Sequence, residues 1–216
     1  MKEFLLWDHD GVLVDTERWY YEATKAVLRE AKIRLSQDAY LEYMAEGRSC
    51  WDLARASGAS EAEVRGLRAR RDALYQHCLK TEDIEIPGVR EVVEELAAHY
   101  RMAIVTTSRR EDFDLIHRCR DLRRHFEFVL TKGDYERSKP APDPYLAAVS
   151  RFGARVRQAV AIEDSSRGLR SALAAGCDCV VIESAFTSSQ DFRGASLVLG
   201  SVLELPGALG RMGGVA

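Results

Sequence analysis

Two carboxylates separated by one residue stand near the start of the chain, and they could take part in metal or phosphoryl chemistry. Asp8 and Asp10 follow the apolar run Phe4–Trp7, which is typical of a buried strand, and Gly11 then lets the chain turn. Side chains two apart on an extended segment point the same way, so both acids should share one face. Adjacent acids repel each other unless a cation or a proton lies between them. Taken alone, the pair fits an acidic surface turn equally well, so its meaning depends on partners elsewhere.

Polar residues close two later apolar segments, and a single lysine precedes a loop stiffened by prolines. They are Thr106, Thr107 and Ser108 after one segment, Glu163 and Asp164 after another, and Lys139 before Pro140. The carboxyl ends of parallel strands meet at one edge of a sheet, so these groups should gather beside the two aspartates. Carboxylate oxygens at this density favour a hard cation, most simply Mg²⁺. With a lysine and hydroxyl groups added, the set contains the parts that phosphoryl transfer requires.

The elements that must position these groups change character once along the chain. Residues 16–82 are helical throughout by their apolar spacing, and Ser60 with Glu63 forms a capping box. From Gly88 onward strands and helices alternate, which predicts a parallel sheet with right-handed crossovers. We expect five strands, near Phe4, Met102, Phe126, Ala159 and Cys179. The Gly- and Leu-rich tail shows no clear periodicity, and we expect residues 207–216 to be poorly ordered.

At this point the chain resembles phosphatases of the haloacid dehalogenase superfamily with a small helical cap, the group of phosphoglycolate phosphatases and β-phosphoglucomutases. The resemblance spans residues 4 to about 182. Its motifs are Asp8-His9-Asp10-Gly11-Val12 with Asp15-Thr16-Glu17, Thr106 after a strand, Ser138-Lys139-Pro140-Ala141-Pro142-Asp143, and Ile162-Glu163-Asp164-Ser165 with Gly168. It implies an α/β fold with a Rossmann-like parallel sheet core, strand order 3-2-1-4-5, and an inserted α-helical cap. Residues 1–15 and 84–216 would form the catalytic core and residues 16–83 the cap.

The resemblance also implies roles for the four acids. Asp8 would be the nucleophile that forms an aspartyl-phosphate. Asp10 would protonate the leaving alcohol and then activate the hydrolytic water. Asp8, Asp10, Glu163 and Asp164 would hold Mg²⁺, with Asp10 contributing its backbone carbonyl. The implied reaction is Mg²⁺-dependent hydrolysis of a small phosphorylated metabolite.

The remaining site residues are expected to bind the phosphoryl group or the substrate. By the same resemblance, Thr106 would hold the transferring phosphoryl group, and Lys139 would neutralise it together with Asp8. Thr107 and Ser108 lie in the same turn and are expected to bind phosphate. Arg48, in a loop between two cap helices, could reach a substrate anion, although the interpretation as a solvated loop arginine is slightly favoured.

Three other activities compete with phosphatase. Sugar-phosphate mutases of the superfamily carry a histidine where this chain has Tyr20, and a cap arginine where it has Cys50, so both differences favour hydrolysis. Dehalogenases lack an acid equivalent to Asp10. A phospho-aspartate signalling switch would use Asp8, but it needs neither a leaving-group acid nor a cap. A catalytically silent relative is disfavoured because every motif residue is present.

Several notable residues have a structural interpretation. His9 should point away from the two acids and pack in the interior. Asp143 should be the N-cap of a helix whose first residue is Pro144, and Ser165 is expected to cap the helix that follows it. The five cysteines, Cys50, Cys78, Cys119, Cys177 and Cys179, are best interpreted as buried, reduced thiols.

Composition excludes several classes of partner. The formal net charge of −3 over 216 residues, with charges of both signs interspersed, argues against nucleic acid and anionic membranes. No apolar run approaches the roughly 20 residues of a membrane span, and no signal-peptide pattern is visible. We therefore expect a cytoplasmic enzyme, monomeric or homodimeric, whose partner is a small phosphorylated metabolite.

Overall fold

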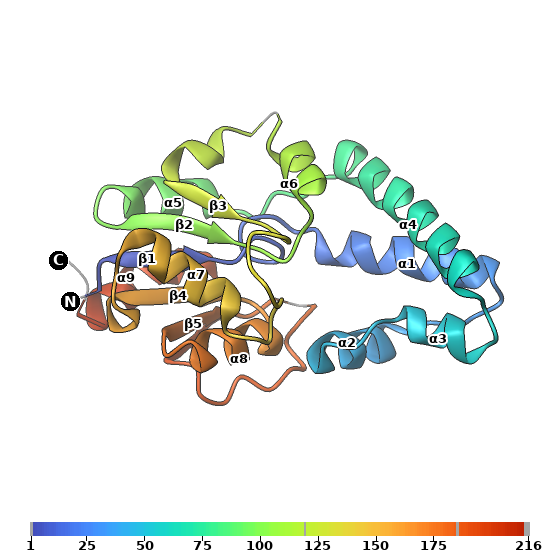
Figure 1. Cartoon of the computed structure of the whole chain (residues 1–216). Coiled ribbons are helices and arrows are strands. Elements are labelled where there is room, and N and C mark those ends of the chain that lie inside the picture. The colour runs from blue at the N-terminus through green and yellow to red at the C-terminus, as the bar shows by residue number, and fades with distance from the viewer. Residues whose placement is uncertain (1, 119, 185, 214–216) are drawn as a thin grey trace. The chain divides into compact units, whose positions relative to one another are not determined.

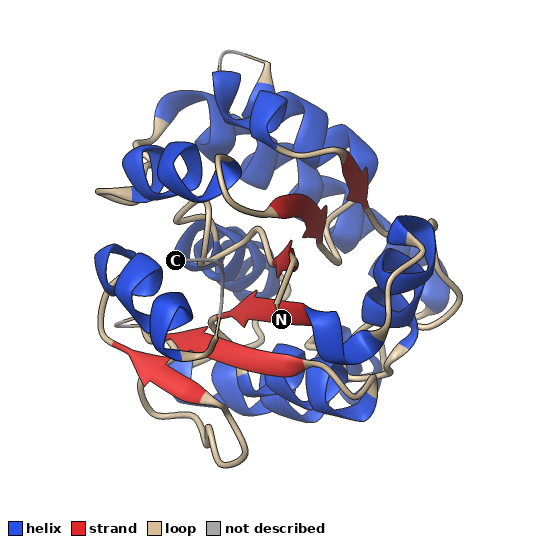
Figure 2. Cartoon of the chain, turned by 90° about the vertical axis from the view of Figure 1, so that its left-hand side faces the viewer, coloured by secondary structure: helices blue, strands red, loops and turns tan. Residues whose placement is uncertain are grey.

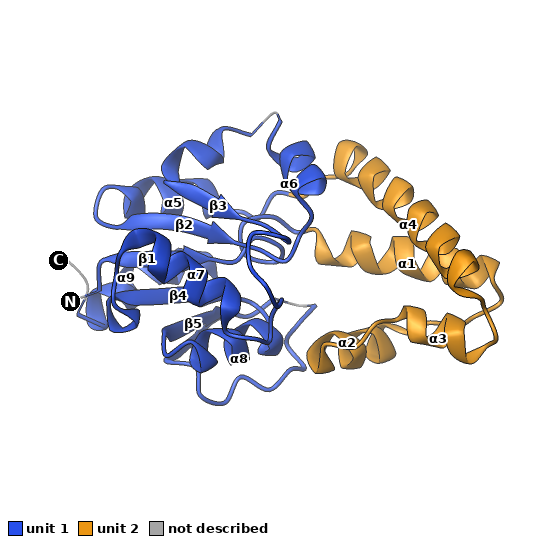
Figure 3. Cartoon of the chain, in the orientation of Figure 1, with its two compact units in different colours: residues 1–15, 85–216 blue, residues 16–84 orange. Residues whose placement is uncertain are grey.

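The computed structural model describes residues 2–118, 120–184 and 186–213 and divides into two compact units (Figure 3). Residues 1–15 and 85–216 form what we call the α/β unit, and residues 16–84 form the helical unit. Ile84 thus falls in the helical unit, although the sequence analysis placed it with the core. None of the described helices combines the length and the apolar character that crossing a membrane requires.

The α/β unit is built on one parallel sheet with the strand order β3-β2-β1-β4-β5-β6 (Figure 1). The strands are β1 (Phe4–Trp7), β2 (Arg101–Val105), β3 (Phe128–Leu130), β4 (Ala159–Glu163), β5 (Asp178–Ile182) and β6 (Leu197–Leu199). β1 is central and pairs with both β2 and β4, so that Leu6 lies level with Ala103 and Ala161. The α/β fold class and the predicted order of the first five strands are confirmed.

Helices cover both faces of the sheet (Figure 2). They are α5 (Val89–Ala97), α6 (Arg110–His117), α7 (Asp143–Phe152), α8 (Ser166–Ala174) and α9 (Leu205–Arg211). Leu5 and Trp7 belong to a core formed with α5, α6 and α9, whereas Phe4 and Leu6 belong to a core formed with α7 and α8. Because both faces of β1 are buried, the strand requires the uninterrupted apolar run seen in its sequence.

The C-terminal segment differs from the expectation of a poorly ordered tail. In this segment, residues 197–199 form a sixth strand, Val202–Glu204 forms a short 3₁₀ turn, and residues 205–211 form α9. Two further 3₁₀ turns occur earlier in the chain, at Asp121–His125 and Val156–Gln158. Leu205 is 0% and Leu209 1% exposed, and both belong to the core beside β1. The expectation for residues 207–211 was therefore wrong, because the apolar residues of this short helix are too few to reveal a period.

The helical unit consists of α1 (Glu17–Glu30), α2 (Gln37–Glu46), α3 (Trp51–Ala56) and α4 (Glu61–Thr81). The predicted capping box is present: Ser60 Oγ accepts from the backbone N–H of Glu63, and the Glu63 carboxylate accepts from the backbone N–H of Ser60. Arg71 of α4 is buried with its guanidinium 4.1 Å from the ring centre of Tyr20 on α1. That cation–π contact joins the first and the last helix of the unit.

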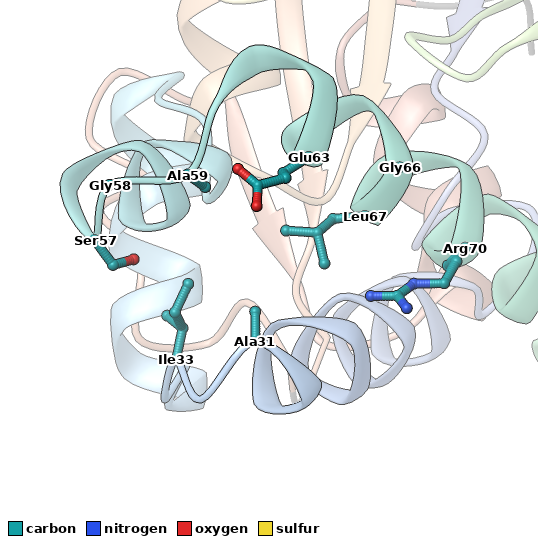
Figure 4. Close-up of a pocket in the computed structure, with 9 residues that line it drawn as sticks. All are labelled: Ala31, Ile33, Ser57, Gly58, Ala59, Glu63, Gly66, Leu67 and Arg70. Carbon is teal, nitrogen blue, oxygen red and sulfur yellow. The ribbon is translucent and has the colours of Figure 1, made fainter.

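A hollow of about 690 Å³ opens within the helical unit, between the end of α1, the turn before α4 and the first turns of α4 (Figure 4). Its two charged lining residues already have partners. Glu63 belongs to the capping box, and Arg70 forms an ion pair of 3.3 Å with Glu30. The hollow therefore offers no convergent set of reactive groups.

The described cysteines are free thiols. Cys50, Cys177 and Cys179 are buried and Cys78 is half-buried, while Cys119 lies outside the described residues. Burial raises the pKa of the Cys177 thiol to about 11, which keeps the thiol protonated near neutral pH.

Two leucines close to each other in sequence test whether the C-terminal segment belongs to the core. Leu205 is fully buried, whereas Leu203 is 62% exposed. Leu205→Ala should lower the free energy of unfolding by about 2–5 kcal/mol, because it leaves a cavity. Leu203→Ala should cost less than about 1 kcal/mol. Urea unfolding of both variants measures the difference, and equal small effects would show that α9 contributes little to the core.

Candidate active site

The first predicted acid lies where β1 ends. The backbone N–H of Asp8 donates to the carbonyl of Ile162 at 2.8 Å, which continues the pairing of β1 with β4 one residue past the strand. The chain then turns tightly, because the His9 carbonyl accepts from the N–H of Leu13 at 2.8 Å. Gly11 has a φ of +84°, and a Cβ there would collide with the carboxylate of Asp164. Glycine is thus required both for the backbone conformation and for the close approach of that acid.

Three buried carboxylates converge at this edge of the sheet. Asp8, Glu163 and Asp164 each offer an oxygen, and these oxygens lie within 4.8 Å of one another. Burial, followed by the negative charge of Glu163, raises the pKa of Asp8 to about 7, although Lys139 acts in the opposite direction. A hard cation would relieve this repulsion, and oxygen ligands at such separations suit Mg²⁺. The donor set therefore fits the magnesium ion that the sequence predicts.

Lys139 is the cation that the structure places among these acids. Its side chain is 2% exposed, and Nζ donates to Asp8 Oδ1 at 2.8 Å and to Glu163 Oε1 at 2.6 Å. Burial by itself would lower the pKa of Lys139, but the two carboxylates outweigh burial and raise the pKa above its ordinary value. The ammonium thus stays charged, and it joins the ends of β1 and β4 to the loop before α7.

Tyr145 of α7 completes this network and was missed by the sequence analysis. Its hydroxyl donates to Glu163 Oε1 at 2.5 Å, and its ring centre is 5.1 Å from Lys139 Nζ. Glu163 Oε1 therefore accepts from both Lys139 and Tyr145, so Glu163 positions the lysine as well as belonging to the acidic group. A tyrosine on the buried face of a helix looks like an ordinary core residue, and no sequence signal distinguishes this one.

The second predicted acid, Asp10, lies against the end of β2. Its Oδ2 accepts from Ser108 Oγ at 2.6 Å and from Thr106 Oγ1 at 3.2 Å. The Asp10 side chain does not belong to the group of three converging carboxylates. A metal role for Asp10 through its backbone carbonyl stays a prediction. The structure thus brings the first acid motif together with the polar turn after β2.

The turn after β2 is held by its own hydrogen bonds. The backbone N–H of Ser108 donates to Thr106 Oγ1 at 3.0 Å, and the Tyr135 hydroxyl donates to the Thr106 carbonyl at 2.7 Å. Thr107 is half-buried in the same turn. Burial raises the pKa of Tyr135 to about 12, so the tyrosine remains a donor across the physiological range. Tyr135 is a second supporting residue that the sequence did not reveal.

His9 is fully buried, as the sequence analysis expected, but it does more than pack. Its ring lies 4.9 Å from that of Phe113 and 5.1 Å from that of His117, measured between ring centres. Its two nitrogens face His117 Nε2 at 2.9 Å and Asp10 Oδ2 at 3.4 Å. The ring therefore does not point away from Asp10, because β1 ends at Trp7 and strand alternation no longer applies beyond it.

Two capping predictions have different outcomes. Ser165 Oγ accepts from the N–H of Gly168 at 3.1 Å and caps α8, as expected. Asp143 is not an N-cap: Pro142 occupies that position and Asp143 is the first helical residue. The Asp143 carboxylate instead accepts hydrogen bonds from the Arg137 guanidinium at 3.0 Å, so its partner is a residue that precedes the helix.

Arg48, the one site residue predicted in the helical unit, follows the C-cap Gly47 of α2. Its guanidinium pairs with Glu46 at 2.9 Å and lies 4.2 Å from the ring centre of Tyr43, and its side chain is 50% exposed. These contacts match those of a solvated loop arginine. A role for Arg48 in binding a substrate anion stays a prediction.

Residues 5–182 match the haloacid dehalogenase-like hydrolase family. The match covers most of the chain, so the protein belongs to this family, as the sequence motifs indicated. It is an enzyme of that family, a phosphomonoester hydrolase, in agreement with the sequence analysis.

Two curated relatives and one solved structure illustrate the likeness. The plasmid-encoded protein CbbY of Cupriavidus necator is 31% identical over 220 residues, covering 90% of this chain and 84% of that protein. The phosphorylated carbohydrates phosphatase of Thermotoga maritima is 27% identical over 183 residues, covering 82% of each. A CbbY variant from Rhodobacter sphaeroides, crystallised with xylulose 1,5-bisphosphate, has a TM-score of 0.81 at 23% identity and covers 95% of this chain and 96% of its own. The last comparison concerns the fold alone.

Two glycines inside helices test how tightly the acidic group is packed. A Cβ on Gly168 of α8 would collide with the Glu163 carboxylate, whereas a Cβ on Gly66 of α4 meets nothing within 4 Å. Gly168→Ala should therefore displace Glu163 and with it Lys139, lowering phosphate-ester turnover at least about 10-fold. Gly66→Ala should raise the free energy of unfolding by up to about 1 kcal/mol and leave turnover unchanged. Unchanged turnover in Gly168→Ala, measured beside urea unfolding, would contradict the geometry.

Proposed function

We propose that this enzyme is a Mg²⁺-dependent phosphatase that hydrolyses a small phosphorylated sugar through an aspartyl-phosphate on Asp8. The observation that carries the proposal is the buried bond from Lys139 to Asp8 inside a group of three converging carboxylates. A nucleophilic carboxylate, a charged lysine and a cation site in one place are the requirements of phosphoryl transfer through a covalent intermediate.

In the first step, a carboxylate oxygen of Asp8 attacks the phosphorus atom of the ester. The bond from phosphorus to the substrate oxygen breaks, and Asp10 gives a proton to the departing alkoxide. Ser108 and Thr106 both donate to Asp10 Oδ2, so the proton that leaves is carried on Oδ1. Lys139 neutralises negative charge that builds up on the transferring group, while its bond to Asp8 keeps the nucleophile aligned.

In the second step, water attacks the phosphorus atom of the aspartyl-phosphate. Asp10, now a carboxylate, takes the proton from that water, and the bond between phosphorus and the Asp8 oxygen breaks. Inorganic phosphate forms, and both acids return to their starting states. One residue can serve as acid and then as base because the two steps need opposite proton transfers.

Asp8 and Asp164 would be the principal ligands of Mg²⁺. Glu163 shares one oxygen with Lys139 and Tyr145, so its contribution would come through Oε2 or through water. When bound, the ion would supply positive charge next to the phosphoryl oxygens.

Relatives support a sugar phosphate as the substrate class. One matched relative is a phosphorylated carbohydrates phosphatase, and a CbbY variant of the same fold binds xylulose 1,5-bisphosphate. Two alternatives remain as outcomes of the test. A mutase would return the phosphoryl group to another hydroxyl, and a signalling switch would retain it on Asp8.

The proposal predicts release of phosphate that requires both the metal and the nucleophile. The substrates are xylulose 1,5-bisphosphate, fructose 1-phosphate, glycerol 3-phosphate, phosphoglycolate and hexose 1- and 6-phosphates, each assayed with Mg²⁺ and with EDTA. Asp8→Asn should lower kcat at least about 10³-fold, because the amide oxygen is a poor nucleophile. Asp191→Asn, which alters an exposed carboxylate paired with Arg193, should behave as wild type.

Other results would redirect the assignment. Interconversion of hexose phosphates without phosphate release would establish a mutase. A stable aspartyl-phosphate without turnover would favour the switch. Release that persists in Asp8→Asn would rule out the covalent route.

Binding of the metal should also be visible without catalysis. Adding Mg²⁺ should raise the Tm of the wild-type protein by about 5–10 °C, because a ligand at about 100 times its Kd stabilises the folded state by about 2.7 kcal/mol. Asp164→Asn should lose most of this increase, while Asp191→Asn should retain it. An equal increase in all three proteins would place the bound ion elsewhere.

A further inference from the structure

A fully buried histidine, His9, and a half-buried one, His117, lie beside the acid Asp10. His9 follows β1 and is 0% exposed, and His117 is the last residue of α6. Their Nε2 atoms are 2.9 Å apart, and Phe113 packs against both rings, with ring centres 4.9 Å and 4.4 Å away. The other ring nitrogen of His9, Nδ1, lies 3.4 Å from Asp10 Oδ2. The histidine pair thus connects α6 to the carboxylate proposed as acid and base.

The contacts within the histidine pair determine where its hydrogens lie. Two imidazole nitrogens at hydrogen-bond distance need one donor and one acceptor. If His9 carried its hydrogen on Nε2 alone, its Nδ1 lone pair would face Asp10 Oδ2, the oxygen that carries no proton in the proposed mechanism, and this contact is repulsive. If His9 carries the hydrogen on Nδ1, that N–H donates to Asp10, and His9 Nε2 accepts from His117 Nε2–H. Of these two neutral arrangements, only the second makes both contacts attractive.

The surroundings of His117 agree with that arrangement. Among the described residues, none bonds His117 Nδ1, so a hydrogen there would be a buried donor without a partner. Burial, followed by the neighbouring His9, lowers the pKa of His117 to about 3, so the ring is neutral. A neutral ring with its hydrogen on Nε2 leaves Nδ1 as a bare acceptor, the less costly of the two states.

We propose that His9 and His117 are positioning residues for Asp10, acting through a chain of hydrogen bonds from His117 Nε2–H to His9 Nε2 and from His9 Nδ1–H to Asp10 Oδ2. The proposal deepens the proposed function, since it rests on Asp10 as the leaving-group acid. His9, Ser108 and Thr106 each direct one hydrogen-bond donor at the same oxygen of Asp10, Oδ2. In the proposed mechanism, the proton for the departing alkoxide is then carried on the other oxygen of Asp10.

The hydrogen positions can be measured without any catalysis. Nitrogen-15 NMR of the full-length apo protein distinguishes protonated from bare imidazole nitrogens, and His117→Phe identifies the resonances of the pair among the five histidines. The expected result is a protonated Nδ1 and bare Nε2 on His9, with a protonated Nε2 on His117. A His9 with a bare Nδ1, or a doubly protonated His9, would overturn the proposal.

The positioning role is tested by how the variants depend on the leaving group. The two substrates are p-nitrophenyl phosphate, whose phenolate leaves without a proton, and the sugar phosphate that wild type hydrolyses best. Comparing kcat/KM isolates the step in which the leaving group departs. His9→Leu should lower kcat/KM about 10-fold for the sugar phosphate and less than about 3-fold for the aryl phosphate, because only the former needs the acid.

Conservative variants separate hydrogen bonding from packing. The amide nitrogen of asparagine reaches the place of Nδ1, so His9→Asn should recover the sugar-phosphate activity to within about 3-fold of wild type. His117→Gln should likewise act better than His117→Phe, since glutamine can replace the Nε2 donor. Equal losses on both substrates, or equal losses in His9→Leu and His9→Asn, would reduce the histidine pair to core packing.

The outcome also distinguishes this proposal from the proposed function. If wild type releases phosphate from no ester, the phosphatase proposal fails, and the NMR result alone decides whether the hydrogen-bond chain exists. If a leucine variant does not fold, as judged by its thermal unfolding, His117→Phe against His117→Gln supplies the same comparison.

Discussion

The contact on which the site depends is the ammonium of Lys139 between Asp8 and Glu163. Parallel strands bring β1 and β4 side by side, and so they bring two buried carboxylates to the same edge. Without a cation between them, repulsion between these two carboxylates would oppose the pairing of β1 with β4. Removing one partner of a buried ion pair costs about 3–5 kcal/mol, since the other charge is left uncompensated. Stability and chemistry are therefore coupled in one side chain.

The residues that hold the acids in place lie on two sides of β1, one next to β4 and one next to β2. On the β4 side, Tyr145 and Lys139 share one oxygen of Glu163, and Gly168 provides the space for that carboxylate. On the β2 side, Ser108 and the histidine pair converge on Asp10. The nucleophile and the acid are thus held by separate sets of contacts, even though only one residue lies between them. A change to one flank need not disturb the other.

The sequence predicted what local pattern and motif order determine, namely the parallel sheet, its first five strands and the residues at the strand ends. It failed where a contact depends on distant residues. Tyr145 and His117 look like ordinary helix residues, and their partners lie elsewhere in the chain. Asp143 seemed a cap because it precedes a proline, but Arg137 binds its carboxylate. Strand β6 escaped notice because its apolar run, Leu197–Leu199, is only three residues long and is followed at once by Gly200 and Ser201.

The short strands at the two edges of the sheet affect the tendency of the protein to aggregate. The two outermost strands, β3 and β6, have three residues each, whereas the four between them have four or five. Short edge strands offer few unpaired backbone N–H and C=O groups onto which another chain could add a strand. Parallel sheets expose long apolar strands while they fold, which makes this protection valuable. The sheet's geometry thus works against edge-to-edge aggregation.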